Sequence, residues 1–214
     1  MSDLAGGRYP DSEEEWLLDG MPVPPYRRTI SRRDIAAGST GVALTQAYLF
    51  VYAIPVQAGD ILDYISFLVK TATATPTHSW AALYNGVGTG AALLAQTADA
   101  TGGFAANANK LQLGSVVSNI GTVGTPQGPS TAAAVAQGPA VWGVALYNSG
   151  ATGAVLDGMP GGNVAGAVTL TGQPALVSNA ALSATATAPT VLPTMTAGPQ
   201  TGAGAIPYIV LSRS

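Results

Sequence analysis

The 214-residue chain is long enough for one β domain of about 180 residues and an additional segment. Its net charge of −3 and its lack of a basic stripe argue against a nucleic-acid binder, and no nucleic-acid partner is expected. The absence of cysteine excludes disulfides, thiolate metal sites and cysteine nucleophiles.

Two further patterns bear on secretion and membranes. The first residues are acidic and lack the basic and then apolar pattern of a secretory signal, so we expect none. Every apolar stretch is interrupted before it reaches the roughly 18 residues of a transmembrane helix, so membrane insertion is not expected. The apolar run 47–55 is too short to span a bilayer and predicts a buried strand.

Charge is concentrated in the first 34 residues, which hold seven acids and five arginines. The remaining 180 positions carry only seven charges. A free soluble domain has about a quarter of its residues charged. This break predicts two parts: an extended N-terminal anchoring arm over residues 1–35, and a body over residues 36–214 that is held in an assembly.

Within the arm, residues 12–18 predict one helical turn, with Ser12 as N-cap and Glu15 as its capping-box partner. The prolines of 22–25 then favour an extended path. Such a short helix is not stable alone, so its apolar residues need a surface, either on a partner or on their own domain. We expect the arginines to pair with carboxylates of a partner rather than with phosphates. The candidate partner-binding residues are Trp16, Leu17, Leu18, Tyr26, Arg27, Arg28, Arg32 and Arg33.

Downstream of the arm, short segments rich in Val, Thr, Ala, Leu and Tyr alternate with Gly, Pro, Asn and Ser turns. This pattern predicts an all-β sandwich or barrel. The candidate strands are 42–54, 61–71, 78–85, 91–97, 110–117, 139–148, 152–156, 166–171, 180–187 and 204–212. Residues 131–136 are the one candidate helical turn, within an otherwise irregular stretch at 100–139.

A short internal sequence similarity supports the prediction of an all-β fold. The segment 80–85 (WAALYN) returns as 142–148 (WGVALYN), and both end in a turn. Alternation with a period of two places one of the tryptophans on an inner face. Two similar strands of this kind fit the two halves of a double Greek-key sandwich.

The sequence offers little catalytic or metal-binding chemistry. His78 is the only histidine, and we interpret it as a turn or core imidazole bonded to backbone. Asp60 follows a turn glycine and is expected to cap backbone N–H groups rather than to form a glycosidase pair with Asp63. The glycine run 86–90 fits neither a P-loop nor a dinucleotide fingerprint. We therefore expect no enzyme activity, no catalytic residues, no metal and no cofactor.

Aromatic residues are the one hint of sugar binding. Most are better interpreted as core residues, although a glycan-binding patch stays open as an alternative. The residues concerned are Tyr48, Tyr52, Tyr64, Trp80, Tyr84, Trp142 and Tyr147.

Several segments together carry a family resemblance over about residues 37–212. They are 58–62 (AGDIL), 75–84 (TPTHSWAALY), 93–99 (LLAQTAD), 142–147 (WGVALY), 184–189 (ATATAP) and 206–210 (IPYIV). In these segments the chain resembles the β-sandwich domain of minor tail, fibre and head-decoration proteins of actinobacterial tailed phages. The resemblance implies a jelly-roll-like antiparallel β-sandwich displayed on a virion, often as a trimer.

The resemblance and the arm together predict a non-enzymatic structural protein of a tailed-phage virion. The expected partners are capsid or tail subunits bound by the arm, and further copies of the chain. Members of the family carry this domain at the end of a longer chain, whereas here it follows a short arm, so capsid and tail stay open as sites. The alternative is the receptor- or glycan-binding head of a tail fibre. The expected location is the virion surface, after assembly in the host cytoplasm.

Overall fold

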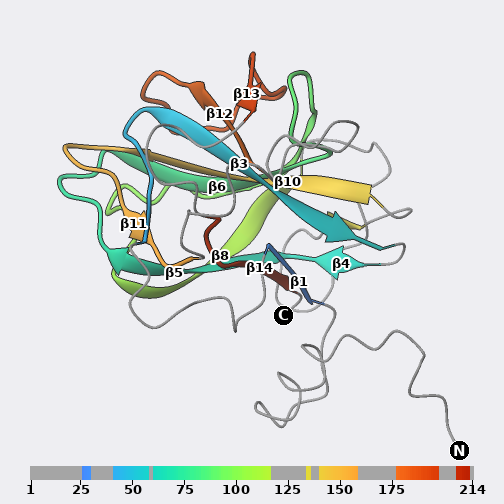
Figure 1. The fold of residues 1–214 in the computed structure, drawn as a ribbon, viewed down its shortest axis with the longest axis horizontal. Helices are drawn as coiled ribbons and strands as arrows, with labels where there is room; N and C mark the ends of the chain where they lie inside the picture. The colour runs from blue at the N-terminus through green and yellow to red at the C-terminus, as the bar shows by residue number, and fades with distance from the viewer. Residues whose placement is uncertain are drawn as a thin grey trace, which may run out of the picture.

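The computed structural model describes residues 26–29, 41–57, 60–116, 134–135, 140–158, 177–197 and 206–212. Every helix or strand assigned within these ranges is a β-strand (Figure 1). The strands are β1 (Tyr26–Arg28), β2 (Val42–Ala43), β3 (Tyr48–Val56), β4 (Ile61–Leu62), β5 (Tyr64–Thr71), β6 (His78–Tyr84), β7 (Leu93–Thr97), β8 (Asn107–Val116), β9 (Ala134–Val135), β10 (Ala140–Ser149), β11 (Val155–Leu156), β12 (Val177–Ala181), β13 (Thr196–Ala197) and β14 (Ile209–Ser212).

Twelve strands form one continuous antiparallel sheet that folds over into two layers. The first layer, sheet A, has the order β1-β14-β5-β8, with β11 beside β5 and β2 beside β11. The second layer, sheet B, has the order β7-β6-β10-β3-β12-β13. Strand β8 joins the layers, because residues 107–112 pair with β5 and residues 113–116 pair with β7. Strands β4 and β9 form a separate two-stranded pair.

The predicted all-β antiparallel sandwich is therefore confirmed. Neighbouring strands are often distant in sequence: β10 lies between β3 and β6, and β14 lies between β1 and β5. Long connections of this kind are what a jelly-roll-like or Greek-key arrangement requires. Of the predicted arm, only residues 26–29 lie within the described part of the chain.

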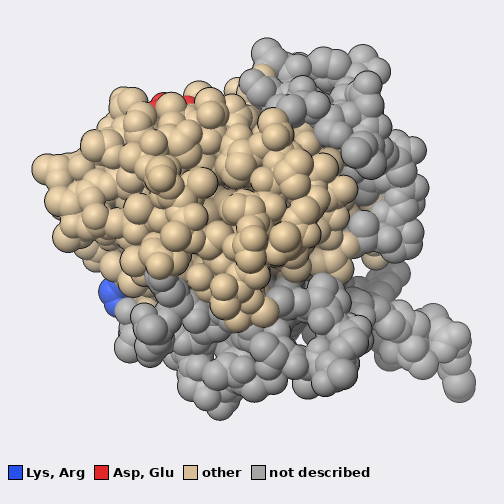
Figure 2. Space-filling model, turned by 90° about the horizontal axis from the view of Figure 1, so that it is seen from above, with Lys and Arg blue, Asp and Glu red and all other residues tan. Residues whose placement is uncertain are grey.

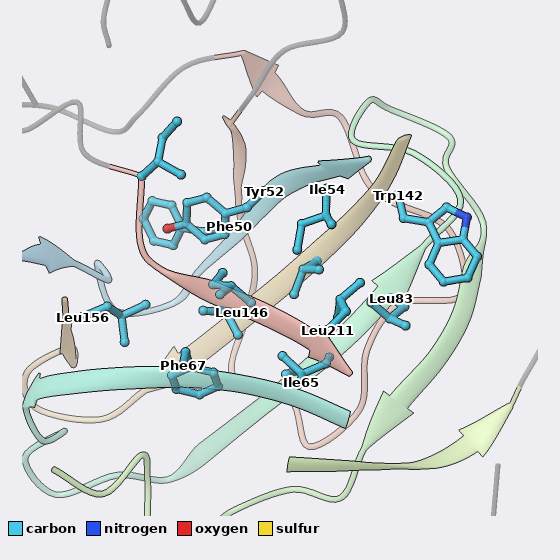
Figure 3. Close-up of a cluster of buried hydrophobic side chains, with 14 of the residues drawn as sticks. Phe50, Tyr52, Ile54, Ile65, Phe67, Leu83, Trp142, Leu146, Leu156 and Leu211 are labelled. Carbon is cyan, nitrogen blue, oxygen red and sulfur yellow. The ribbon is translucent and has the colours of Figure 1, made fainter. Parts of the chain in front are cut away.

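Sheets A and B pack face to face over an inner cluster of buried apolar side chains (Figure 3). Alternation with a period of two selects the members of this cluster along each strand. Strand β3 contributes Phe50, Tyr52 and Ile54, and β5 contributes Ile65 and Phe67 from the other layer. Each such side chain contributes roughly 1.5–3 kcal/mol when it is fully buried.

A second apolar cluster lies on the opposite face of sheet B. The other side chains of β3, Leu49 and Val51, belong to it, together with Trp80 of β6 and Tyr147 of β10. The two rings stack with centroids 4.9 Å apart and planes 19° apart. Since Trp80 and Tyr147 are directly opposite in the β6–β10 register, strand pairing itself creates the stack.

Residues 182–195, here called the strap, cover this outer cluster on the side of sheet B away from sheet A (Figure 1). Its apolar contacts come from Leu182, Ala188, Leu192 and Met195. The polar tips of three aromatic side chains donate hydrogen bonds to strap carbonyls. They are Trp80 Nε1 to Thr185 O at 2.9 Å, Tyr84 OH to Pro189 O at 2.8 Å, and Tyr147 OH to Ser183 O at 3.2 Å. The strap thus forms a third layer over the sandwich.

Several predicted boundaries are wrong. The strand predicted at 180–187 corresponds to β12, which ends at residue 181. The residues that follow belong to the strap, whose carbonyls accept hydrogen bonds from the buried aromatic side chains. The helical turn predicted at 131–136 is also wrong: Ala134 and Val135 pair with β4. The candidate 42–54 is divided into β2 and β3 by a turn at Ala47, whose φ is +55°. The candidate 166–171 lies outside the described residues.

The two similar segments are adjacent strands of one sheet rather than equivalent strands in two halves. Trp142 lies in the inner cluster and Trp80 in the outer cluster, which confirms that one tryptophan faces the interior of the sandwich. The interpretation of 47–55 as a buried strand is also confirmed, because residues 49–54 of β3 are all buried.

Gly143 of β10 is predicted to tolerate no side chain. A Cβ there would lie 2.2 Å from the carbonyl oxygen of Gly86 and 2.6 Å from Val51 Cγ1. Gly143→Ala should lower the free energy of unfolding by about 1–3 kcal/mol, measured by urea denaturation. Gly114→Ala is the matched control, because nothing lies within 4 Å of a Cβ in that strand position. Equal stability of the two variants would contradict the packing described for β10.

Stability should fall in alkali. Burial raises the pKa of the Tyr52 and Tyr84 phenols well above the usual value of about 10. Above about pH 10 the unfolded chain loses these two protons while the folded chain retains them, so ionisation favours unfolding. Urea denaturation should give a free energy of unfolding about 3 kcal/mol lower at about pH 11 than at about pH 9. Tyr84→Phe should remove about half of that fall, and an undiminished fall would contradict the assignment.

Candidate functional site

The predicted partner-binding residues of the arm divide into two groups. Tyr26, Arg27 and Arg28 form β1, which pairs antiparallel with β14 at the edge of sheet A. The remaining predicted residues lie outside the described part of the chain, and their role stays a prediction. These are Trp16, Leu17, Leu18, Arg32 and Arg33.

Thr29 holds the end of β1 on the body. Its backbone N–H donates to the carbonyl of Ile209 at 3.0 Å, and the N–H of Ile209 donates back to Thr29 Oγ1 at 3.0 Å. The Thr29 hydroxyl also donates to the carbonyl of Pro207 at 2.5 Å. The described part of the arm is therefore bound to its own domain, a junction that we call the arm junction (residues 27–29 with Gln57, Asp60, Pro207 and Ile209).

Arg27 makes the charged contact of the arm junction. Its Nε donates to Asp60 Oδ2 at 2.5 Å and its Nη2 to Asp60 Oδ1 at 2.8 Å. The same Nη2 donates to Gln57 Oε1 at 3.0 Å. Arg27 was expected to bind a carboxylate of a partner, whereas the carboxylate that it binds in the described residues is in its own chain.

Asp60 also performs the role that the sequence predicted. Its Oδ2 accepts a hydrogen bond from the backbone N–H of Gln57 at 2.7 Å, so its expected capping of a turn is confirmed. The side chain of Asp60 is 7% exposed and that of Arg27 is 28% exposed. Sequence inspection missed this pair, because nothing local links two residues 33 positions apart.

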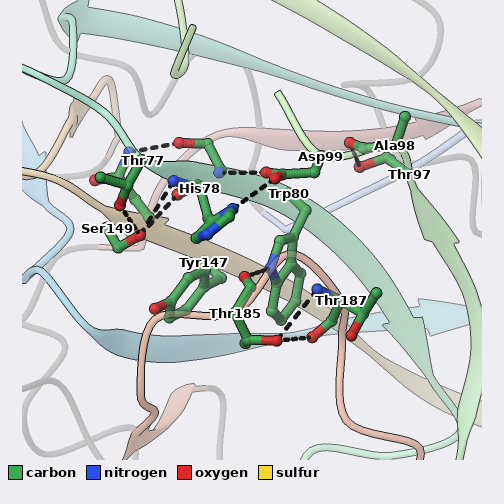
Figure 4. A network of polar contacts seen from close by, with 12 residues as sticks. Thr77, His78, Trp80, Thr97, Ala98, Asp99, Tyr147, Ser149, Thr185 and Thr187 are labelled. Carbon is green, nitrogen blue, oxygen red and sulfur yellow. Dashed lines mark hydrogen bonds and ion pairs between the residues drawn. The ribbon is translucent and has the colours of Figure 1, made fainter. Parts of the chain in front are cut away.

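A second polar cluster surrounds His78 at the start of β6 (Figure 4). His78 Nδ1 lies 2.6 Å from Asp99 Oδ2, and Asp99 Oδ1 accepts the N–H of Ser79 at 2.9 Å. Ser149 Oγ accepts the backbone N–H of His78 at 3.2 Å and lies 2.7 Å from Thr77 Oγ1. The expectation of an imidazole bonded to backbone is wrong, because the ring is held by a carboxylate.

In the His78 cluster, the serine hydroxyl is not positioned to transfer its proton to the imidazole ring. In a Ser–His–Asp triad, the ring nitrogen remote from the carboxylate receives the serine proton. Here Ser149 Oγ instead bonds the backbone N–H and the carbonyl of His78, the latter at 3.3 Å. Both oxygens of Asp99 are occupied. The cluster therefore acts as a tie between β6, β10 and the segment after β7.

An open groove of about 510 Å³ lies beside this cluster. Two of its lining residues, Ala47 and Thr75, have positive φ, at 55° and 42°, which is a strained conformation for a residue with a Cβ. The lining consists of Gln46, Ala47, Thr75, Thr77, Ser149, Gly150, Ala151 and Ala184. Its polar groups are neutral hydroxyls and an amide, which can bind a neutral polar ligand by hydrogen bonds.

The aromatic residues considered for sugar binding are mostly core residues, as expected. Tyr48 and Tyr64 are half-buried, and the Tyr64 ring is partly covered by Lys110, whose Nζ lies 4.0 Å from the ring centroid. The fully buried ones are Tyr52, Trp80, Tyr84, Trp142 and Tyr147. These seven residues therefore form no exposed aromatic platform for a sugar ring.

Two kinds of feature, a metal-binding cluster and a membrane-spanning helix, are missing from the described ranges. The described residues hold no group of three or more His, Asp or Glu side chains close enough to bind a metal ion. Within those ranges, a helix with the length and hydropathy needed to cross a membrane is also absent.

Charge is segregated between the layers. The strands of sheet B and the strap contain no Lys, Arg, Asp or Glu. Figure 2 views this side of the molecule, and charge appears only at the margin of its described surface. The charged residues of the described ranges belong to sheet A, the arm junction or loops: Arg27, Arg28, Asp60, Asp63, Lys70, Asp99, Lys110 and Asp157.

The chain has no significant match among protein-family models, curated proteins or solved structures. The family resemblance of the sequence segments therefore stays a prediction.

Asp99 is predicted to be structural. Asp99→Ala removes the acceptor for His78 Nδ1 and for the N–H of Ser79. The free energy of unfolding should fall by about 1–3 kcal/mol, measured by urea denaturation. Asp157→Ala is the matched control at a half-buried carboxylate that follows β11. A loss no larger for Asp99→Ala than for the control would contradict the tie between the strands.

Proposed function

We propose that the chain is a non-enzymatic structural protein of a tailed-phage virion. Its β-sandwich is displayed on the particle surface, and the N-terminal arm attaches it to a capsid or tail subunit. The observation that carries the proposal is the segregation of charge: sheet B and the strap are uncharged, whereas the arm holds most of the charges of the chain.

An uncharged layer suits a protein that is packed among copies of itself. Like charges that face each other across an interface cost free energy, and a charge that is buried without a partner costs several kcal/mol. The strap presents small neutral side chains, and Val191, at 49% exposed, is the large apolar residue that it leaves in solvent. Contact between such layers requires no desolvation of charge, which favours a homo-oligomer such as a trimer.

The arm has the opposite character. Trp16, Leu17 and Leu18 provide apolar anchors, and aromatic and arginine side chains commonly dominate interface energy. The prolines of 22–25 reduce the conformational entropy that is lost when the arm is ordered on a partner. Arg27 is engaged with Asp60 of its own chain, and Arg32 and Arg33 are the arginines proposed to contact the partner subunit.

The non-enzymatic assignment is supported by the His78 cluster. Its serine hydroxyl bonds backbone rather than the imidazole, and its carboxylate is used twice within the fold. The protein is therefore proposed to act through binding and display. Its proposed location is the virion surface, after assembly in the host cytoplasm.

A receptor-binding head is the second candidate. The groove lined by Thr75, Thr77 and Ser149 favours it, because neutral hydroxyls match the hydrogen-bonding groups of a host cell-surface glycan. The burial of the aromatic side chains removes the usual stacking platform for sugars. Saturable binding of cell-wall polysaccharide, abolished by Thr77→Ala, would favour this candidate over a purely structural role.

Deletion of residues 1–25 should separate folding from attachment. The truncated chain keeps β1 and the arm junction, so its melting temperature should be unchanged within about 2 °C. Its copy number on purified particles, measured by quantitative mass spectrometry, should fall to background. Trp16→Ala should weaken attachment by about 3 kcal/mol if this residue fills a partner pocket. Normal loading of the truncated chain would remove the arm as the anchor.

A further inference from the structure

The Arg27–Asp60 pair occupies a particular position in the sandwich. Arg27 is opposite Leu211 in the β1–β14 register, and Leu211 lies in the inner cluster. Because directly opposite residues share a face of the sheet, the Arg27 side chain lies on the inner side of sheet A. Asp60 lies where the chain crosses from β3 of sheet B towards β4 and β5. The ion pair therefore joins β1 of sheet A to the segment through which the chain leaves sheet B.

The acceptor side of this contact is built by the body alone. The N–H of Asp60 donates to the carbonyl of Gln57 at 3.1 Å, and the N–H of Gln57 donates to Asp60 Oδ2 at 2.7 Å. This turn places Asp60 Oδ1 and Oδ2 beside Gln57 Oε1, and the Arg27 guanidinium contacts all three oxygens. The arrangement is a fixed socket for a planar guanidinium fork, which a lysine ammonium cannot fill in the same way.

Besides the ion pair, this part of the arm is held by the short β1–β14 ladder and by the hydrogen bonds of Thr29 with Ile209 and Pro207. Strand β1 has three residues, and among the described strands it lies at the end of the sheet order, beside β14. Short edge segments with few contacts open locally at low free-energy cost. Asp60 is 5% exposed, and undocking of β1 would leave its carboxylate without its cation. The ion pair therefore adds a charged contact that favours the docked position of β1.

We propose that Arg27 and Asp60 form a latch that docks β1 on β14 and fixes the point at which residues 1–25 leave the domain. Arg27 is then a positioning residue that acts within its own chain. The part of the arm that binds the partner lies outside the latch, in residues 16–18 before β1 and in Arg32 and Arg33 after it. The latch itself is a property of the isolated chain, and only its effect on particle loading rests on the function proposed above.

Amide hydrogen exchange of the full-length protein tests the latch directly. The probes are the N–H groups of Thr29 and Ile209, which bond across the arm junction, and the N–H of Val144 in β10 serves as a core reference. Arg27→Gln and Asp60→Asn should each accelerate exchange at Thr29 by about tenfold or more, with Val144 unchanged. The double variant should exchange no faster than either single variant, because both remove the same interaction.

Two lysine variants control for charge and for position. Arg27→Lys keeps the charge and loses the fork, so it should accelerate exchange at Thr29 partially. Arg28→Lys makes the same change one residue further along β1, where the side chain lies on the opposite face from Asp60, and should accelerate exchange at Thr29 less than Arg27→Lys does. Unchanged protection in Arg27→Gln, or an equal loss of protection at Val144, would overturn a local latch.

Particle loading separates this inference from the proposed function. Arg27→Gln retains all residues before Tyr26, yet its copy number on particles should fall several-fold, because the departure point of the arm is no longer fixed. Normal loading of the chain that lacks residues 1–25 would reject the proposed function, and the exchange rates at Thr29 would then decide alone whether the latch exists. If the arm proves necessary, normal loading of Arg27→Gln would overturn the positioning role of Arg27.

Discussion

The central constraint on this molecule is that both faces of sheet B are apolar and must be shielded from solvent. Strand β3 buries Phe50 and Tyr52 on one side and Leu49 and Val51 on the other. A sheet that is apolar on both faces requires a cover on each side. Sheet A covers the inner side and the strap covers the outer side, so the sandwich has a third layer made without regular strands.

The strap in turn determines which side chains are exposed to solvent on that side of the molecule. Its carbonyl oxygens accept hydrogen bonds from buried Trp and Tyr side chains, and the backbone of residues 190–192 also bonds that of residues 90–93. Its outward side chains are small and neutral, in a segment composed largely of Ala, Thr, Ser and Pro. The surface on this side is therefore uncharged because the strap covers the outer cluster. The charged residues lie in sheet A, the loops and the arm.

Much of the fold could be predicted from the sequence, because the signals were local. Alternation and turn residues located most strands, and the apolar run of β3 indicated a buried strand. Residues 182–187 of the strap were predicted as part of a strand at 180–187, because alternating Ala and Thr residues are typical of an exposed strand. The hydrogen bonds that hold this segment come from aromatic side chains distant in sequence, which no local pattern indicates. Residues 134 and 135 were mistaken for helix, because alanine favours helix and the pairing with β4 is a long-range contact.

The candidate site was less predictable for the same reason. Asp60 was correctly expected to cap a turn, which is a local role, whereas its pairing with Arg27 depends on how β14 brings the arm beside the β3–β4 crossover. The carboxylate on His78 likewise comes from a residue 21 positions away. In both cases the sequence identified one residue of the pair, and the strand topology determines which distant residue it contacts.

The proposed function rests on the uncharged layer formed by sheet B and the strap, beside an arm that holds most of the charges. Its most direct test is to locate the protein on intact particles and to count its copies by immunogold labelling and quantitative mass spectrometry. We expect the protein on the particle surface in a fixed copy number that matches a symmetric capsid or tail site. Absence of the protein from purified particles would contradict the virion assignment.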